Sequence, residues 1–324
     1  MFTVVVPVHD KARTLRRTVE HALRQTFDEF ELILVDDGST DGSIATVADL
    51  ADPRLRILTQ SRQGPGGARN RGIAEARHEW VAFLDGDDLW HPDHLAELDR
   101  IRRQHPEAAL IGTAHLSSDS AGRFAWPRDR GGRIEPFSYL AAIGRGEKTL
   151  ITSSAAARTS ILREMGGFGP TSRGEDAQLW VRIALAYPLA RSTRVTVVYV
   201  HGTGGITETL VRPWSGAVPA GPEALSPAIA TALAARPSAS PALQSEIDAF
   251  VRRNLRWWLD SSASRGDRAA VRTIAGFHLD PLPLEQRAKL LASRLPDFLA
   301  GPAMRLVASG AQALRRLASG LGGP

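Results

Sequence analysis

The segment from Trp80 to Trp90 constrains the fold of this chain most strongly. Its apolar part, 80–84, is short enough for a buried strand, and three carboxylates follow at Asp85, Asp87 and Asp88. The carboxyl edge of an open α/β sheet is where ligands bind, and carboxylates crowded there repel one another unless a cation lies among them. Hard oxygen ligands favour Mg²⁺ or Mn²⁺, which keep coordination sites for substrate phosphates. The alternative is a polar Asp-Gly turn between a strand and a helix.

The first 90 residues alternate short apolar runs with helix-like segments. The pattern predicts strands at 2–8, 30–35, 55–58 and 80–84, a helix at 12–26, and a flexible glycine-rich loop at 64–70 that leads into a helix ending near Ala76. Strands and helices that alternate in this way form a parallel, Rossmann-like sheet. Asp36 with Asp37, and the cluster at 85–88, follow strands of the same sense. We therefore expect both acidic clusters at one edge of the sheet.

The rest of the chain divides into three regions. Up to residue 210, the pattern predicts helices at 93–104, 160–165 and about 173–186, strands at 108–115, within 147–157 and at 195–200, and a mobile polar loop at 117–135. We expect one α/β domain over 1–210. Residues 211–242 are rich in Pro, Ala, Gly and Ser and predict a linker around a short helix. Residues 243–324 predict a helical C-terminal region.

Composition narrows the setting in which the chain works. It has 324 residues, of which 43% are hydrophobic and 23% charged, and it has no cysteine. These values are ordinary for a globular protein, and the lack of cysteine excludes disulfides and Cys-based zinc sites. No apolar run approaches the ~20 residues of a transmembrane helix. The N-terminus enters a strand with no signal-peptide pattern, so we expect a cytoplasmic protein.

The formal charge of +5 arises in the C-terminal region, because residues 1–240 are balanced. A basic region of this kind suits a membrane surface or an acidic partner. It lacks the aromatic interleaving of a nucleic-acid reader, so we expect no nucleic-acid partner. The amphipathic stretch 304–321 predicts either a helix packed against its own domain or peripheral contact with the inner membrane face.

Six short motifs occur in a recognisable order. They are Val-Val-Val-Pro-Val-His-Asp at 4–10, Leu-Val-Asp-Asp-Gly-Ser-Thr-Asp-Gly-Ser at 34–43, Gly-Gly-Ala-Arg-Asn-Arg-Gly-Ile at 66–73, Phe-Leu-Asp-Gly-Asp-Asp at 83–88, Gly-Gly-Phe at 166–168 and Gly-Glu-Asp-Ala-Gln-Leu-Trp at 174–180. Over about 2–210 the chain resembles family 2 glycosyltransferases of the GT-A fold. The resemblance implies a Rossmann-like, mixed but mainly parallel sheet flanked by helices. It also implies transfer of a sugar, with inversion, from a nucleotide-diphosphate donor to an acceptor hydroxyl.

The resemblance also implies roles for individual residues. Nucleotide binding would fall to Pro7, Val8, His9, Asp10, Asp36, Arg69 and Asp85, with Asp36 on the base, usually uracil, and Arg69 near the diphosphate. Asp85 and Asp87 would hold a divalent metal, Mn²⁺ or Mg²⁺, with His201 on the metal or the donor phosphates, and Asp176 would be the general base. The pair His9-Asp10 departs from the Tyr-Asn that is common in the family, and a charged Asp10 is unexpected beside a base. The partners implied are a nucleotide-sugar donor and a carbohydrate, lipid-linked or protein acceptor.

The chemistry of such a transfer is consistent with these residue types. A metal stabilises the charge that develops on the departing diphosphate without any proton transfer. The acceptor hydroxyl must lose its proton, for which one carboxylate suffices. Asp176 would open a helix, where the helix dipole favours its ionised form, although it could simply cap that helix. His201 could equally be a surface histidine.

Two other functions compete with this interpretation. A nucleotidyltransferase needs a glycine-rich phosphate loop after the first strand, and 7–11 has no glycine there. A non-catalytic nucleotide-sugar-binding or scaffold protein, built on a degenerate domain, predicts loss of the metal carboxylates or of the base. Both are present, and the scaffold protein is kept as the alternative.

Overall fold

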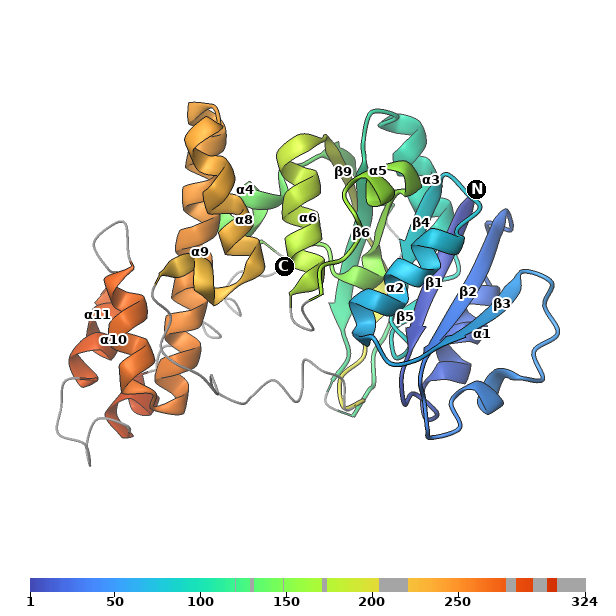
Figure 1. Ribbon diagram of the computed structural model, residues 1–324, viewed down its shortest axis with the longest axis horizontal. Coiled ribbons are helices and arrows are strands. Elements are labelled where there is room, and N and C mark those ends of the chain that lie inside the picture. The colour runs from blue at the N-terminus through green and yellow to red at the C-terminus, as the bar shows by residue number, and fades with distance from the viewer. Residues whose placement is uncertain are drawn as a thin grey trace. The chain divides into compact units, whose positions relative to one another are not determined.

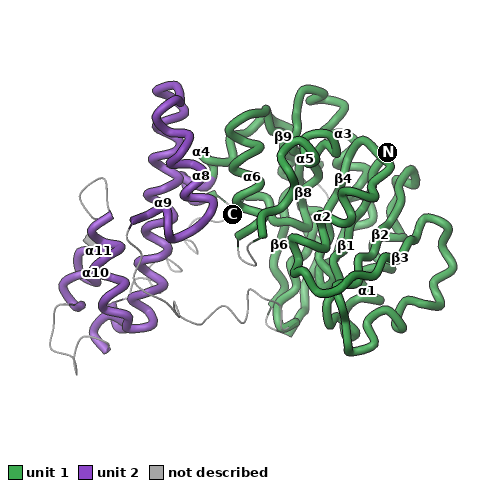
Figure 2. Tube along the Cα trace, in the orientation of Figure 1, with its two compact units in different colours: residues 1–142, 147–209 green, residues 143–146, 210–324 purple. Residues whose placement is uncertain are grey.

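The computed structural model describes residues 1–119, 121–128, 131–147, 149–170, 174–203, 221–277, 284–293 and 302–307. The chain separates into two compact units (Figure 2): 1–142 with 147–209, and 143–146 with 210–324. The predicted boundaries after residues 210 and 242 stay predictions. Each unit is described by itself below.

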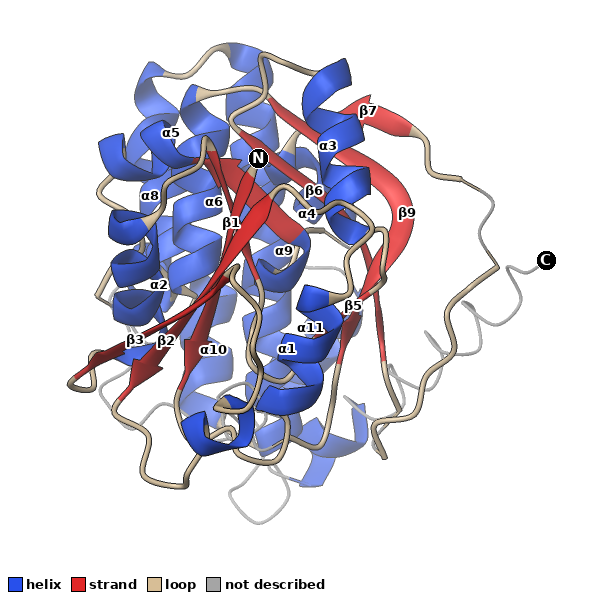
Figure 3. Ribbon diagram, turned by 90° about the vertical axis from the view of Figure 1, so that its right-hand side faces the viewer, coloured by secondary structure: helices blue, strands red, loops and turns tan. Residues whose placement is uncertain are grey.

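One mixed sheet runs through the first unit (Figure 3). Its strands are β1 (Phe2–Val8), β2 (Phe30–Asp37), β3 (Leu55–Gln60), β4 (Trp80–Phe83), β5 (Leu89–Trp90), β6 (Leu110–Ser117), β7 (Ile134–Pro136), β8 (Ala155–Arg158) and β9 (Leu189–Tyr199). The order is β3-β2-β1-β4-β8-β6-β9-β5, with β7 beside β9. The first four strands pair in parallel, and β8 lies antiparallel between β4 and β6. The expected α/β fold with a mixed sheet flanked by helices is confirmed.

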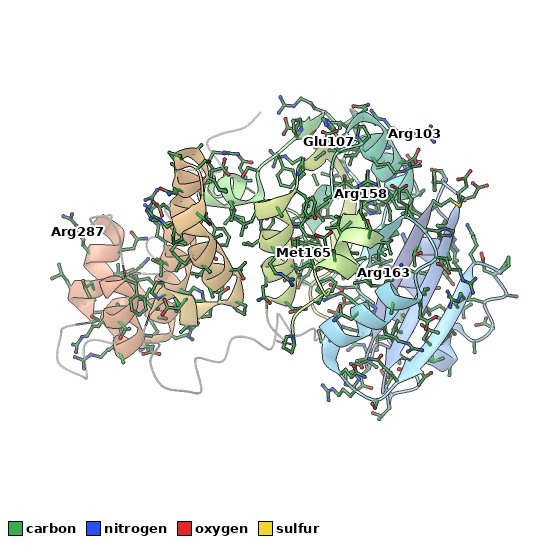
Figure 4. The ribbon with its side chains drawn as sticks, turned by 45° about the horizontal axis from the view of Figure 1, so that its top comes forward. Arg103, Glu107, Arg158, Arg163, Met165 and Arg287 are labelled. Carbon is green, nitrogen blue, oxygen red and sulfur yellow. The ribbon has the colours of Figure 1, made fainter. Side chains whose placement is uncertain are left out.

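Helices cover both faces of this sheet (Figure 1). They are α1 (Leu15–Leu23), α2 (Gly64–Glu75), α3 (His94–Gln104), α5 (Thr159–Glu164) and α6 (Glu175–Ala186), whereas α4 (Tyr139–Arg145) is divided between the two units. Alternate residues of β1 point to opposite faces of the sheet. Val4 and Val6 share a buried core with α1 and α3, whereas Val5 faces α2. On that second side, Arg163 of α5 donates to the carbonyl oxygens of Ile73 (3.1 Å) and Ala76 (2.9 Å) at the end of α2 (Figure 4).

The prediction of a flexible loop at 64–70 was wrong, because these residues form the first half of α2. Glycine here serves close packing. A Cβ on Gly72 would lie 2.3 Å from Val5 Cγ1, and one on Gly66 would lie 3.1 Å from the carbonyl oxygen of Gly169. Pro65 stands in the first turn of the helix, where its missing N–H costs nothing. The glycine-rich composition therefore brings α2 close to the sheet instead of loosening the chain.

The second unit is helical. It holds α8 (Pro227–Ala235), α9 (Pro241–Arg265), α10 (Arg268–Gly276) and α11 (Leu284–Ala292), with single 3₁₀ turns at Pro222–Leu225 and Arg236–Ser238, and residues 302–307 are also helical. A small core joins Ala263, Val271, Ala292 and Met304. The part of the predicted amphipathic helix after residue 307 lies outside the described residues. Within the described ranges, we find no helix with the length and apolarity needed to span a membrane.

Candidate functional site

The carboxyl ends of β1, β2 and β4 meet at one edge of the sheet. In the parallel register, Val8 lies opposite Asp36 and Val5 lies opposite Phe83. The loops that follow these strands carry both acidic clusters, which therefore lie at the same edge. The alternation of strands and helices in the sequence predicts the same arrangement.

The loop after β1 is tied to the loop after β2 through Asp10. This residue has a left-handed backbone with φ of 51°, which Asp and Asn tolerate better than other residues with a side chain. Its carboxylate accepts a hydrogen bond from the Thr40 amide (2.8 Å), and its amide donates to Ser39 Oγ (3.2 Å). His9 Nδ1 lies 3.0 Å from the Asp37 carbonyl oxygen, and its Nε2 lies 3.5 Å from Asp10 Oδ2. The unexpected charge of Asp10 thus holds the neighbouring loop in place.

The two carboxylates after β2 differ in what they contact. Asp37 is 2% exposed and accepts hydrogen bonds from Gln60 Nε2 (2.8 Å) and from the amides of Gln63 and Gly64 (both 2.7 Å). It therefore fixes the start of α2. Asp36 accepts a bond from the Ser39 amide at 3.0 Å. Of the two, Asp36 is the better candidate for contact with a nucleotide base.

Each predicted metal-binding carboxylate lies against a basic side chain. Asp87 forms an ion pair with Lys11, and its Oδ2 also accepts a hydrogen bond from Thr203 Oγ1 at 3.0 Å. Asp85 Oδ1 accepts a bond from Arg69 Nη2 at 2.6 Å. Lys11 and Thr203 were not predicted as site residues, because their pairing with Asp87 depends on chain segments more than 70 residues apart.

Asp88 anchors this acidic loop. It is 1% exposed, and its carboxylate accepts hydrogen bonds from Ser153 Oγ (2.5 Å) and from the Val200 amide (3.0 Å). Burial, together with the negative charges of Asp85 and Asp87, raises the pKa of Asp88 well above its ordinary value. The side chain joins the end of β4 to the end of β9, and this contact gives it a positioning role.

The turn at Thr152–Ser154 is a part of the site that the sequence analysis missed. Thr152 Oγ1 donates to Asp176 Oδ2 at 2.8 Å. Its neighbour Ser153 bonds to Asp88 and also accepts a hydrogen bond from the Asp85 amide at 3.1 Å. Two adjacent hydroxyl side chains thus hold the predicted base and the predicted metal loop. The sequence signal that could have revealed this turn is its run of three hydroxyl residues directly before strand β8.

Arg69 bridges the acidic loop and the start of α6. It is 4% exposed, and Nη1 donates to Glu175 Oε1 at 2.9 Å, while its guanidinium carbon lies 5.2 Å from the centre of the Phe168 ring. Although burial disfavours its charged form, the carboxylates of Asp85 and Glu175 raise the pKa of Arg69 above its ordinary value. The predicted contact with a diphosphate stays a prediction. What the geometry provides is a link between two acidic segments.

The predicted base lies in the first turn of α6. Asp176 Oδ1 accepts a hydrogen bond from the Ala177 amide at 2.7 Å, and Gly174, with φ of 66°, precedes the helix. Its neighbour Glu175 is 7% exposed, and burial raises the pKa of Glu175 despite the opposing charge of Arg69. The two adjacent carboxylates therefore have different surroundings, and among the described residues Glu175 is the one that forms an ion pair, with Arg69.

His201 is the last of the predicted site residues. The amide of His201 donates to Ser118 Oγ at 2.9 Å, and its ring packs edge-on against Tyr199. Among the described residues, no three His, Asp or Glu side chains converge as a set of metal ligands, and the predicted contact of His201 with a metal or the donor phosphates stays a prediction. Two tryptophans that follow predicted site motifs, Trp90 and Trp180, are 0% and 1% exposed and pack in the core.

Comparison with known proteins places these features in a family. The family model described as "Glycosyl transferase family 2" matches residues 3–166. The succinoglycan biosynthesis protein ExoO of Rhizobium meliloti is 43% identical over 115 residues, which is 35% of this chain and 32% of that protein. Glycosyltransferase GlyG of Streptococcus pneumoniae is 35% identical over 127 residues, 38% of this chain and 42% of that protein. The matches thus span less than half of these relatives.

Solved structures share the fold over nearly the whole chain. The crystal structure of S. aureus TarS 1–349 in complex with UDP-GlcNAc has a TM-score of 0.64 at 16% identity and covers 96% of this chain and 91% of that one. The mannosyltransferase PcManGT from Pyrobaculum calidifontis, in complex with GDP-Man and Mn²⁺, has a TM-score of 0.58 at 20% identity, with coverages of 95% and 85%. At these identities the likeness establishes the fold alone. Because the family model matches half of the sequence, the chain belongs to glycosyl transferase family 2.

Proposed function

We propose that the chain is an inverting glycosyltransferase that moves a sugar from a UDP-sugar to an acceptor hydroxyl in polysaccharide or glycoconjugate synthesis. The observation that carries the proposal is that the same segments hold two sets of acidic residues, one in the loop after β4 and one at the start of α6. Arg69 donates to Asp85 and to Glu175, and the neighbours Thr152 and Ser153 bond to Asp176 and Asp88. The family and the curated relatives named for succinoglycan biosynthesis support glycosyl transfer in polysaccharide synthesis.

The donor nucleotide would bind at the edge formed by the loops after β1 and β2. In this proposal Pro7 to Asp10 line the pocket and Asp36 accepts a hydrogen bond from the base. The contacts of Asp10 with the main chain of the neighbouring loop support a preformed pocket. UDP is the nucleotide of one structural neighbour and GDP that of another, so the choice of base is a matter for experiment.

The donor set at this edge fits a hard divalent cation. Asp85 and Asp87 supply carboxylate oxygens on one short turn, and Mg²⁺ and Mn²⁺ are commonly held by one or two carboxylates together with substrate phosphates. In the proposal these two residues hold the ion, with His201 as a further contact. When bound, the ion would supply positive charge to the departing diphosphate. Arg69 would keep the Asp85 carboxylate in place, and Ser153 would hold the turn through the Asp85 amide and the Asp88 carboxylate.

Asp176 would accept the proton of the attacking hydroxyl. A single displacement at the anomeric carbon inverts its configuration and needs no nucleophilic side chain. Asp176 suits this role because the first turn of a helix favours an ionised carboxylate. The hydrogen bonds from Thr152 and from the Ala177 amide would fix its orientation.

The acceptor, the membrane contact and the location are also proposals. We propose a carbohydrate, lipid-linked or protein acceptor, and a cytoplasmic protein that contacts the inner membrane face through its C-terminal helices. Exposed leucines on the described helices support such contact, with Leu291 62% exposed and Leu306 75% exposed. No nucleic-acid partner is proposed.

Calorimetric titration with UDP, GDP and dTDP, each with and without Mn²⁺, tests the proposal. We expect UDP to bind tightly only in the presence of the metal. Binding of GDP or dTDP instead would keep the reaction and change the base. Failure of all three nucleotides to bind would favour the non-catalytic scaffold. With an active donor, NMR of the product should show the inverted anomeric configuration.

A further inference from the structure

Lys11 lies across the turn between the two aspartates of the acidic loop. Its ammonium pairs with Asp87, and a Cβ on Gly86 would lie 3.3 Å from Lys11 Cγ, so the lysine stem passes close over the glycine. The Lys11 amide donates to Ser43 Oγ at 2.7 Å, and Thr14 Oγ1 donates to the Gly86 carbonyl at 2.8 Å. Lys11 is therefore held both through its backbone and through its ammonium group. The acidic loop is also hydrogen-bonded to Thr14, directly before α1.

This position conflicts with a divalent cation at the same carboxylate. An ion held by Asp85 and Asp87 would lie within a few ångströms of the Lys11 ammonium, and like charges at that distance repel strongly in a partly buried site. The side chains of Lys11 and Asp87 are only 19% and 13% exposed, which limits screening by solvent. Arg69 opposite Asp85 is buried and doubly paired. Lysine, a point charge on a flexible stem, is the cation that can move.

We infer that Lys11 occupies the cation position at Asp87 in the donor-free chain, so that a divalent metal binds well only together with a nucleoside diphosphate. This inference rests on the proposed function. The negative charges of a diphosphate allow two cationic groups to lie side by side, whereas the metal alone must displace Lys11. Metal and nucleotide therefore raise each other's affinity, and by thermodynamic linkage the factor is the same in both directions.

The test measures Mn²⁺ binding directly, by electron paramagnetic resonance of the unbound ion, with and without UDP. The proteins compared are the full chain, Lys11→Met and Arg13→Met. Arg13 is exposed and stands two positions away, so its variant removes the same charge without touching Asp87. We expect Lys11→Met to bind Mn²⁺ alone about tenfold more tightly, as fits the loss of one neighbouring like charge. The factor by which UDP raises Mn²⁺ affinity should fall about tenfold, and Arg13→Met should change neither value more than about twofold.

Two further variants protect the test against a folding defect. Lys11→Gln offers Asp87 a neutral hydrogen-bond donor and should behave as Lys11→Met. Lys11→Arg keeps the charge and should leave Mn²⁺ binding without UDP as weak as in the parent chain. If the neutral variants bind Mn²⁺ alone no better than the parent, while Mn²⁺ with UDP still binds, the Lys11 inference is overturned and the proposed function survives. If no protein binds Mn²⁺ even with UDP, the proposed function fails and the inference fails with it.

Discussion

At the scale of single residues, the site is held together by side chains that each join distant segments. Ser153 bonds to the Asp85 amide and the Asp88 carboxylate. Arg69 bonds to Asp85 and, 106 residues further along the chain, to Glu175. These contacts link the loop that carries the proposed metal ligands to the first turn of the helix that carries the proposed base.

The proposed roles of Asp176 and Asp87 predict different losses. Asp176→Asn should lower the transfer rate by about 10²-fold or more, which is the usual contribution of a general base, and should leave nucleotide binding nearly intact. Asp87→Ala should weaken metal-dependent nucleotide binding as well as transfer. Steady-state kinetics and calorimetry on the same preparations separate the two effects. Equal loss of nucleotide binding in both variants would argue that Asp176 is structural.

The buried Arg69 bridge predicts a strong effect on stability. Arg69→Met would leave two carboxylates without their buried counter-charge, and breaking such a pair typically costs about 3–5 kcal/mol. Adding Glu175→Gln to that variant should restore part of the lost free energy of unfolding, because one uncompensated charge is then gone. Urea unfolding of the parent, both single variants and the double variant measures this coupling. Strictly additive losses would show that the bridge contributes nothing as a pair.

At the scale of elements, a buried histidine connects helix α3 to strand β9 of the sheet. His94 opens α3 and is 0% exposed, with Nδ1 2.7 Å from Thr196 Oγ1 and its ring centroid 4.3 Å from that of Trp90. Burial first, and then the charge of His91, lowers the pKa of His94 to about 3. The folded protein therefore holds this imidazole neutral over a range in which the unfolded chain binds a proton.

This pKa predicts an acid-dependent loss of stability. The contribution of neutral His94 is present above its ordinary pKa of 6.5 and is lost as the pH falls from there towards 3, at about 1.4 kcal/mol per pH unit. His94→Asn, which keeps a hydrogen-bonding group near Thr196, should be less stable at pH 7 and should show a shallower decline between pH 6.5 and 4. Urea unfolding at a series of pH values gives both curves. Parallel curves for the two proteins would contradict the assignment.

At the scale of the whole molecule, the helical unit carries the proposed membrane contact. Its exposed leucines lie beside arginines on the described helices, with Arg287 one turn before Leu291 and Arg305 next to Leu306. Such pairs suit an anionic lipid surface. The full chain should sediment with anionic vesicles more strongly than a variant lacking 285–324, and added salt should weaken the difference. Equal sedimentation of the two proteins would exclude these helices as the contact.

The sequence by itself determined most of the strands and helices of the first unit and the sheet edge at which the acidic clusters meet. Strands such as 2–8 and 80–84 are recognisable because apolar runs and turn residues are local signals. The two acidic clusters meet because consecutive parallel strands must end on the same side. The order of the motifs indicated the family that the comparisons then established.

Only the tertiary structure decided how the site is held. The antiparallel insertion of β8 brings Ser153 to the acidic loop and Thr152 to Asp176, and no local sequence pattern predicts either contact. The pairing of Lys11 with Asp87 and of Arg69 with Glu175 depends on contacts across 76 and 106 residues. The glycines of α2 resembled a loop because their reason, close approach to Val5 and Gly169, lies in other elements. The spacing of residue types along a chain predicts local helices, strands and turns. Ion pairs and close packing between distant segments depend on how the whole chain folds.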